Sequence, residues 1–322
     1  MPKTFIRPIA LLALCASSAL AHAQSWPAKP IHFIVPYGPG STDILARMLA
    51  PKASAALGQP IVVENRPGAT GNVGSLQVAK SPADGYTLLF GAAAAQAVNP
   101  ALYSNIGYDP IRDLAPVILV ASIPNVVIVN PKLPIKSIAE LIVAAKAQPN
   151  ALNYSSNGSG SSQHMAAALF ESSTGVKMVH VPYKGSTEGI VAVVRGDVSV
   201  MFANLPPAMP LISDGRVRPI AVTSPKRVGS FPNLPTVAEA GVPGFDVSAW
   251  FAIFVPAATP QDIVQRLNKE FGAALADADL RGKLAGQGYI IHGGSPQDLG
   301  ALLRSETVKW AKVVKESGAK AE

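Results

Sequence analysis

Cysteine and charged residues are both scarce in this sequence, and their scarcity excludes several kinds of chemistry. The chain of 322 residues has a single cysteine, Cys15, and only 15% of its residues are charged. Cys15 lies in an apolar N-terminal stretch that looks like a cleavable leader, so we expect a mature chain without a thiol. Disulfides, thiolate catalysis and thiolate–metal sites are therefore excluded.

Histidine pairs and catalytic signature motifs are missing as well. The sequence has no Walker A motif, no full Gly-x-Gly-x-x-Gly fingerprint after a strand and no Gly-x-Ser-x-Gly elbow. Ser161 and His164 lie close together, but no acidic partner is identifiable, and helix capping explains both. We predict a protein that is not an enzyme, with a secreted hydrolase as one alternative. No metal or cofactor is expected, because the histidines outside the leader show no metal-ligand spacing: His32, His164, His180 and His292.

Long apolar runs are also absent after the first residues. Residues 1–23 combine a basic start with an apolar stretch and end on Ala21-His22-Ala23, the pattern of a signal peptide cleaved after Ala23. The apolar stretch is too short to span a membrane, and Leu14 in front of Cys15 argues against lipid attachment. No later stretch approaches 18 uninterrupted apolar residues, so we expect an exported, soluble mature protein.

The positive charge of the chain is not concentrated in one place. The formal net charge is +7, but the lysines and arginines are scattered, without a basic run or interleaved aromatic residues. This distribution argues against nucleic-acid binding. It favours a mild field that attracts anionic solutes.

Strand-like and helix-like segments alternate along the rest of the chain, which is typical of parallel α/β lobes. Two long extended runs, Leu114–Val129 and Phe245–Val255, are long enough to leave one sheet and enter another. The sequence therefore predicts two Rossmann-like α/β lobes joined by two crossing strands, with hinged closure. The first lobe would comprise residues 24–122 and 248–322, and the second residues 123–247, with a ligand cleft between them.

Two Gly/Ser-rich loops that open directly into helices are the most informative feature. Glycine lets backbone N–H groups turn toward one point, and the first turn of a helix has free N–H donors and partial positive charge. Such a loop holds an anion without a charged side chain, so we expect a small anionic ligand that contacts both lobes. The candidate residues are Tyr37, Gly38, Gly40, Ser41, Thr42 and Asp43 in the first loop, and Gly158, Ser159, Gly160, Ser161 and His164 in the second.

Structural roles remain open for several of these candidates. Tyr37 is either a packing aromatic or a platform over the ligand, and His164 is either a capping or packing residue or a ligand contact. Residues 41–43 are candidate N-caps of the first helix. Asp43 is expected to be structural, because its carboxylate would repel an anion. Gly40 is expected to need a positive φ or a close approach of the ligand.

Three further candidates follow predicted strands, where the carboxyl ends of parallel strands face a crevice. Lys184 and Asn204 follow strands of the second lobe. Gln96 ends the small-residue segment after the strand at 86–90 of the first lobe. Lys184 would place a charge near the cleft, and Asn204 could donate to and accept from a polar part of the ligand.

Six segments of the chain match one protein family in order and spacing. The chain resembles the Bug family (Bordetella uptake gene, or tripartite tricarboxylate receptor) of periplasmic solute-binding proteins over essentially all of the mature sequence. The matching segments are Pro36-Tyr-Gly-Pro-Gly-Ser-Thr-Asp43, Val63-Glu-Asn-Arg-Pro-Gly-Ala69, Ala83-Asp-Gly-Tyr-Thr-Leu88, His180-Val-Pro-Tyr-Lys-Gly185, Pro235-Thr-Val-Ala-Glu-Ala-Gly241 and Trp250 to Pro260.

The resemblance implies a type II periplasmic-binding-protein fold and a monomeric protein in the periplasm. It further implies capture of a mono-, di- or tricarboxylate for the membrane subunits of a tripartite tricarboxylate transporter. A protein that presents its carboxylate to a membrane sensor kinase is the alternative. One departure from the family concerns the first loop, which usually has two adjacent glycines and here reads Gly38-Pro39-Gly40-Ser41. Ser41 adds a hydroxyl group and a Cβ atom, so the ligand preference can differ.

Overall fold

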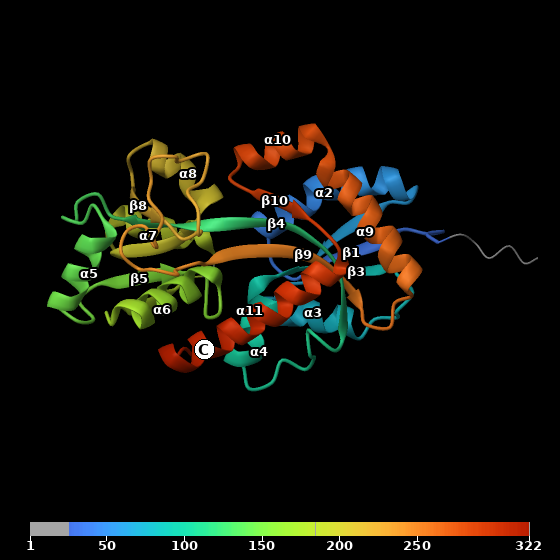
Figure 1. Ribbon diagram of the computed structural model, residues 1–322, viewed down its shortest axis with the longest axis horizontal. Helices are drawn as coiled ribbons and strands as arrows, with labels where there is room; N and C mark the ends of the chain where they lie inside the picture. Colours follow the sequence, from blue (N-terminus) through green and yellow to red (C-terminus); the bar gives the residue numbers. More distant parts are fainter. Residues whose placement is uncertain (1–25, 184, 322) are drawn as a thin grey trace, which may run out of the picture.

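The computed structural model describes residues 26–183 and 185–321, which form two α/β lobes (Figure 1). The predicted signal peptide and the candidate Lys184 lie outside the described residues. Strands and helices alternate along the chain, and the strands form one continuous ten-stranded sheet. The predicted α/β fold class is confirmed.

The first lobe is built on three parallel strands, β1 (Ile31–Val35), β2 (Ile61–Asn65) and β3 (Thr87–Ala92). Apolar side chains of β1 alternate across the sheet, because successive residues of a strand point to opposite faces. Phe33 packs into one core cluster and Ile34 into another, and both are fully buried. The elements that cover this lobe are α2 (Ser41–Leu57), a 3-10 turn (Ala69–Gly71), α3 (Asn72–Ala79), a π-helical turn (Ala94–Val98), α4 (Asn99–Leu102), α9 (Gln261–Ala276) and α10 (Ala278–Gly286).

The second lobe repeats this arrangement with shorter strands. β5 pairs in parallel with β6 on one side and with β7 on the other, and helices cover both faces (Figure 1). Its elements are α5 (Ile138–Ala147), β5 (Asn153–Ser156), α6 (Ser162–Thr174), β6 (Val179–Pro182), α7 (Ser186–Arg195), β7 (Val200–Asn204), α8 (Leu205–Ser213) and β8 (Arg218–Val222).

Two long strands connect the lobes. β4 (Leu114–Val129) pairs in its first part with β9 (Ser248–Pro256) and β10 (Ile290–Gly293), and in its last part with β7 and β8. Leu114 lies opposite Pro256, and Asn125 lies opposite Asn204 at the start of the second-lobe pairing. β4 therefore crosses from one lobe to the other as a single strand, as the sequence predicts.

A helix near the C-terminus forms a third link between the lobes. α11 (Pro296–Ser317) runs between α4 of the first lobe and α6 of the second (Figure 1). Its Trp310 is buried in a core cluster that contains Val98 of the first lobe and Met165 of the second. When one lobe moves against the other, α11 therefore has to bend or slide along one of the two lobes.

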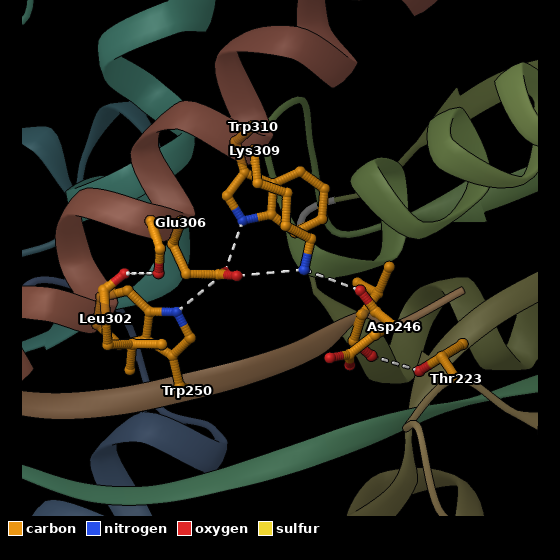
Figure 2. A network of polar contacts seen from close by, with 9 residues as sticks. Thr223, Asp246, Trp250, Leu302, Glu306, Lys309 and Trp310 are labelled. Atoms are coloured by element: carbon orange, nitrogen blue, oxygen red, sulfur yellow. Dashed lines mark hydrogen bonds and ion pairs between the residues drawn. The ribbon is translucent and has the colours of Figure 1, made fainter. Parts of the chain in front are cut away.

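Polar contacts fasten α11 to the strand that crosses between the lobes (Figure 2). The Glu306 carboxylate accepts hydrogen bonds from the indole nitrogens of Trp250 in β9, at 3.3 Å, and Trp310, at 2.8 Å. Lys309 pairs with Glu306 at 3.1 Å and donates to the carbonyl oxygen of Asp246 at 2.9 Å. The side chain of Glu306 is 13% exposed, so these bonds are largely shielded from water.

The structure adds four short helical segments that the sequence pattern does not indicate: the 3-10 turn, the π-helical turn, α4 and α10. α5 follows its N-cap Ser137, whose hydroxyl accepts from the amide of Glu140. The Glu140 carboxylate in turn accepts from the amide of Lys136.

Candidate functional site

A cavity of about 920 Å³ lies between the two lobes. The loop after β1, the turn before α3 and strand β9 line it from one side, and the N-terminal ends of α6, α7 and α8 line it from the other. The lining includes these predicted site residues: Tyr37, Gly38, Gly40, Ser41, Thr42, Gly160, Ser161 and Asn204. Five other predicted residues lie near the cavity or behind its wall without lining it: Asp43, Gln96, Gly158, Ser159 and His164.

The N-terminus of α2 opens into this cavity without a side-chain cap. Gly40 occupies the N-cap position, and the helix begins at Ser41, so the expectation that a side chain of residues 41–43 is the N-cap is wrong. The first intrahelical bond runs from the amide of Ile44 to the carbonyl of Gly40. The amides of the preceding first-turn residues lack intrahelical partners. They form a donor group with partial positive charge at the cavity wall.

The backbone at Gly40 is also different from the one expected. Its φ is 161°, which is nearly extended, and a Cβ atom built there would have no neighbour within 4 Å. The strict requirement for glycine lies at Gly71 and Gly160, with φ values of 94° and 81°. A Cβ atom would approach the Tyr37 hydroxyl to 2.7 Å at Gly71 and the Asn99 side chain to 2.8 Å at Gly160.

Asp43 has the structural role predicted for it. Both carboxylate oxygens of Asp43 accept from Nε of Arg47 at 3.0 Å, one helical turn later. The Asn65 amide donates to Asp43 and to the carbonyl oxygen of Tyr37, each at 2.9 Å. Asp43 therefore orders the first loop and has its charge balanced by Arg47, outside the cavity.

In the second loop, two of the expected anion donors are used within the protein. The amide of Gly160 donates to Nδ1 of His164 at 3.1 Å, and the amide of Ser161 donates to the carbonyl of Gly158 at 3.2 Å. The Ser161 hydroxyl accepts from the amide of His164 and so caps α6. The amides at the start of α6 that precede its first intrahelical bond, those of Ser162 and Gln163, remain for a ligand.

His164 is a packing and positioning residue behind this loop. Its ring stacks on His180 with centroids 4.2 Å apart, and the Tyr154 ring lies against both histidines, 5.0 Å from His180 and 6.4 Å from His164. Burial and the neighbouring His180 lower the pKa of His164 to about 4. Neutral His164 can therefore accept from Gly160 near neutral pH.

Asn204 belongs to a buried chain of amide side chains at the end of β7. Its Oδ1 accepts from Gln163 at 2.6 Å, and its Nδ2 donates to Oδ1 of Asn125 at 2.8 Å. Gln163 also donates to the Ser186 hydroxyl at 2.9 Å. These bonds hold the starts of α6, α7 and α8 together at the cavity wall.

Gln96 points away from the ligand space. Its side chain is fully buried and donates to the Ser75 hydroxyl at 2.9 Å. The π-helical turn at Ala94–Val98 directs it into the first lobe, while Ala94 and Val98 line the cavity. Small apolar side chains and backbone groups therefore form the cavity wall where the side chain of Gln96 was expected.

Sequence reasoning missed a lining segment that has an unusual backbone. Ala69 and Thr70 have φ values of 45° and 50°, in a region that non-glycine residues rarely adopt. The Thr70 hydroxyl donates to the carbonyl of Ser159 at 3.2 Å, a bond between the two lobes beside the cavity. Strained backbone of this kind gathers at functional sites. The turn signal Arg66-Pro67-Gly68 after β2 could have pointed to it. Other lining residues that were missed are Gly68, Gly71, Gln163, Ser186, Ser248, Phe251 and Trp310.

The cavity has little side-chain charge. Within the described part of the chain, its lining contains no lysine, arginine or histidine, and Glu188 is its only carboxylate. Residues 26–183 and 185–321 contain no group of three or more potential metal ligands. None of the helices in these two ranges is long and apolar enough to cross a membrane.

Comparisons with known proteins show the family of this chain. The family model described as "Tripartite tricarboxylate transporter family receptor" matches residues 45–319. Protein BugT of Bordetella pertussis is 39% identical over 311 residues, which cover 96% of this chain and 95% of BugT. The structure of Rhodopseudomonas palustris Rpa4515 with adipate has a TM-score of 0.85 and 40% identity and covers 92% of this chain and 100% of that one. MatC of the same species with bound malate has a TM-score of 0.82 and 31% identity, with 90% and 100% covered.

Proposed function

Since the chain belongs to the tripartite tricarboxylate transporter receptor family, we propose that it captures a small organic carboxylate in the periplasm and delivers it to the membrane subunits of a tripartite transporter. The observation that carries this proposal is the uncapped N-terminus of α2, open to a cavity between two lobes. A carboxylate at this position would accept from first-turn amides and lie at the positive end of the helix dipole.

The way the cavity is built favours binding over catalysis. Its polar groups are mostly backbone amides, hydroxyls and side-chain amides, which bind an anion without reacting with it. Ser161 caps α6, and His164 accepts from Gly160 behind the wall, so the two do not form a nucleophile–base pair. Two relatives with solved structures hold adipate and malate, which are carboxylates.

Capture is proposed to proceed by closure of the lobes. A ligand that contacts α2 of the first lobe and α6 of the second would stabilise the closed arrangement, since only differential contacts shift such an equilibrium. β4 and β9 would bend, and α11 would move with one lobe against the other. The membrane partner would then recognise the closed surface.

Isothermal titration calorimetry with organic acids and their neutral amides tests the proposal. We expect at least one acid to bind and its amide to bind more than tenfold more weakly, because buried N–H groups facing an amide would lose a charge-assisted partner. Equal affinity for acid and amide, or no binding by any acid, would contradict the proposal. A melting curve of each preparation shows that the protein is folded.

A further inference from the structure

We propose that Tyr289 is a positioning residue of the carboxylate site, because its hydroxyl group fixes the first peptide group of α2. This inference rests on the proposed function and adds to it a residue that acts through another. Three observations carry it: the hydrogen bond from Tyr289 to Ser41, the way in which α10 holds α2, and the contact of the turn at 286–289 with the second lobe.

The first observation is a buried hydrogen bond at the start of α2. The Tyr289 hydroxyl donates to the carbonyl oxygen of Ser41 at 2.9 Å, and the tyrosine is only 4% exposed. Burial raises the pKa of Tyr289 to about 12, so the hydroxyl keeps the proton that it donates. The bond is therefore present at every pH at which the protein would bind a carboxylate.

This bond orients an amide that the proposed function assigns to the ligand. The carbonyl group of Ser41 and the N–H group of Thr42 belong to one planar trans peptide and point in opposite directions. Holding the carbonyl oxygen therefore fixes the direction of the Thr42 N–H, one of the first-turn amides without an intrahelical partner. The hydrogen bond also polarises the peptide group and so strengthens its N–H as a donor. Thr42 lines the cavity, at the wall where the carboxylate is proposed to bind.

The second observation is that α10 holds α2 at another point. Lys52 of α2 pairs at 2.9 Å with Asp277, the N-cap residue of α10. Leu284 of α10 is fully buried in the core cluster that contains Leu49 of α2. The body of α2 is therefore fixed without the Tyr289 hydroxyl. Loss of that hydroxyl should disturb the first turn and leave the rest of the helix in place.

The third observation concerns the turn at 286–289, which carries this tyrosine from α10 into β10. Three of its four residues line the cavity. A Cβ atom built at Gly288 would lie 3.2 Å from Leu205 and 3.6 Å from the sulfur atom of Met209, both in α8. The turn therefore contacts the second lobe through Gly288 and α2 through Tyr289. The residue that orients the first peptide of α2 thus lies where the first lobe meets α8.

A matched pair of tyrosine variants tests the inference. Tyr289→Phe keeps the buried ring and removes only the hydroxyl group. Tyr108→Phe is the control, because Tyr108 is also buried, donates to the carbonyl oxygen of Ala95 at 2.9 Å and does not line the cavity. Both variants lose a buried hydrogen bond of the same kind, so we expect similar losses of stability in urea unfolding.

Calorimetry with adipate, malate and benzoate gives the first readout. With the acid that binds the wild type most tightly, we expect Tyr289→Phe to bind at least about fivefold more weakly, and Tyr108→Phe to bind within about twofold of the wild type. Equal affinities of the two variants would overturn the inference and leave the proposed function intact. Failure of all three acids to bind the wild type would contradict both.

The amide resonance of Thr42 gives a second readout, which a purely structural role of Tyr289 would not move. In proton–nitrogen correlation spectra, the saturating acid should shift this resonance in the wild type and in Tyr108→Phe, and much less in Tyr289→Phe. An unshifted Thr42 amide in the wild type would overturn the inference without any variant. The measurement therefore decides the inference even if Tyr289→Phe does not fold.

Discussion

The backbone amide of Gly160 donates a hydrogen bond to Nδ1 of His164, 3.1 Å away. A ring nitrogen that accepts a bond carries no proton, so the imidazole is neutral with its proton on Nε2. The same imidazole stacks on His180 behind the cavity wall. The shape of the second loop therefore depends on the protonation state of a buried histidine.

Stability should fall as the solution becomes acidic because of this histidine. The pKa of His164 is lowered to about 4 from an ordinary value near 6.5, so the unfolded chain takes up a proton first. Its contribution is present above pH 6.5 and is lost as the pH falls toward 4. We expect about 2 kcal/mol less unfolding free energy at pH 5 than at pH 7, from urea denaturation.

A His164→Gln variant provides the comparison for this pH effect. Glutamine does not titrate, so the difference between pH 7 and pH 5 should shrink by most of that amount. His292, whose pKa burial also lowers, stays in both proteins and contributes equally to each. Equal pH slopes for the variant and the wild type would show that His164 is not the group responsible.

Substitution by alanine should destabilise the protein strongly at Gly160 and only slightly at Gly40, although both glycines lie at the cavity. Gly160→Ala forces a Cβ atom onto a backbone with φ of 81°, 2.8 Å from the side chains of Asn99 and Leu102. The left-handed backbone alone costs about 1–2 kcal/mol, so the total loss should exceed about 2 kcal/mol. Gly40→Ala, at an extended residue with open space, should change stability by less than about 1 kcal/mol.

Chemical denaturation of both glycine variants measures this difference, and titration with the best ligand adds a second readout. Gly40→Ala is expected to weaken binding despite its normal stability, because its methyl group enters the space beside the α2 amides. A strongly destabilised Gly40→Ala protein would mean that the backbone of the first loop requires glycine at this position.

Glu306 should stabilise the junction between α11 and β9. Glu306→Gln keeps the shape but removes the charge that accepts from two indole N–H groups and pairs with Lys309 (Figure 2). Since hydrogen bonds to charged groups contribute about 1.5–3 kcal/mol, we expect a loss of about 1–2 kcal/mol. Tryptophan fluorescence should shift as well, because both rings lose a charged neighbour.

The matched control for Glu306 is Glu316→Gln on the same helix. Glu316 is 47% exposed and lies 3.8 Å from Lys312, so its removal should cost less than about 0.5 kcal/mol. Urea unfolding followed by fluorescence compares the two. Equal losses would indicate that the charge at Glu306 has no special role.

Ligand binding should make the molecule more compact. The cavity is much larger than a six-carbon acid, and a ligand that bridges the lobes would draw them together. Small-angle scattering with a saturating ligand should therefore show a smaller radius of gyration than the free protein. An unchanged radius of gyration would contradict closure on binding, and would indicate that the lobes are already closed in the free protein with water in the cavity.

Much of the fold could be predicted because its elements have simple patterns. The loop and helix at 36–57 combine glycines with an apolar periodicity, and Leu114–Val129 is a β-rich run long enough to cross two sheets. α10 escaped prediction because few of its residues are buried, Leu280 and Leu284 among them. Its N-cap is Asp277, whose carboxylate accepts from the amide of Leu280. An aspartate is also common in loops, so this residue alone does not indicate a helix.

The site was harder to predict than the fold, because it depends on which groups are already used within the protein. The sequence indicates that the backbone amide of Gly160 is free to bind an anion, but in the structure this amide already donates to His164. Gln96 reads as a cleft residue, but a π-helical turn rotates it into the core. Asp43 was the exception: its structural role could be predicted because a carboxylate would repel an anionic ligand, and the structure pairs it with Arg47.

The order of strands in the first lobe has a consequence for biogenesis. β3 pairs with β9, so that Leu89 lies opposite Phe254, and β10 covers the first half of β4. The N-terminal lobe therefore cannot complete its sheet until the last part of the chain has been synthesised, and such distant pairings form slowly. The second lobe, encoded by one continuous segment, can assemble earlier. Truncation at the C-terminus should accordingly unfold the lobe that contains the N-terminus and leave the edge of β3 open to aggregation.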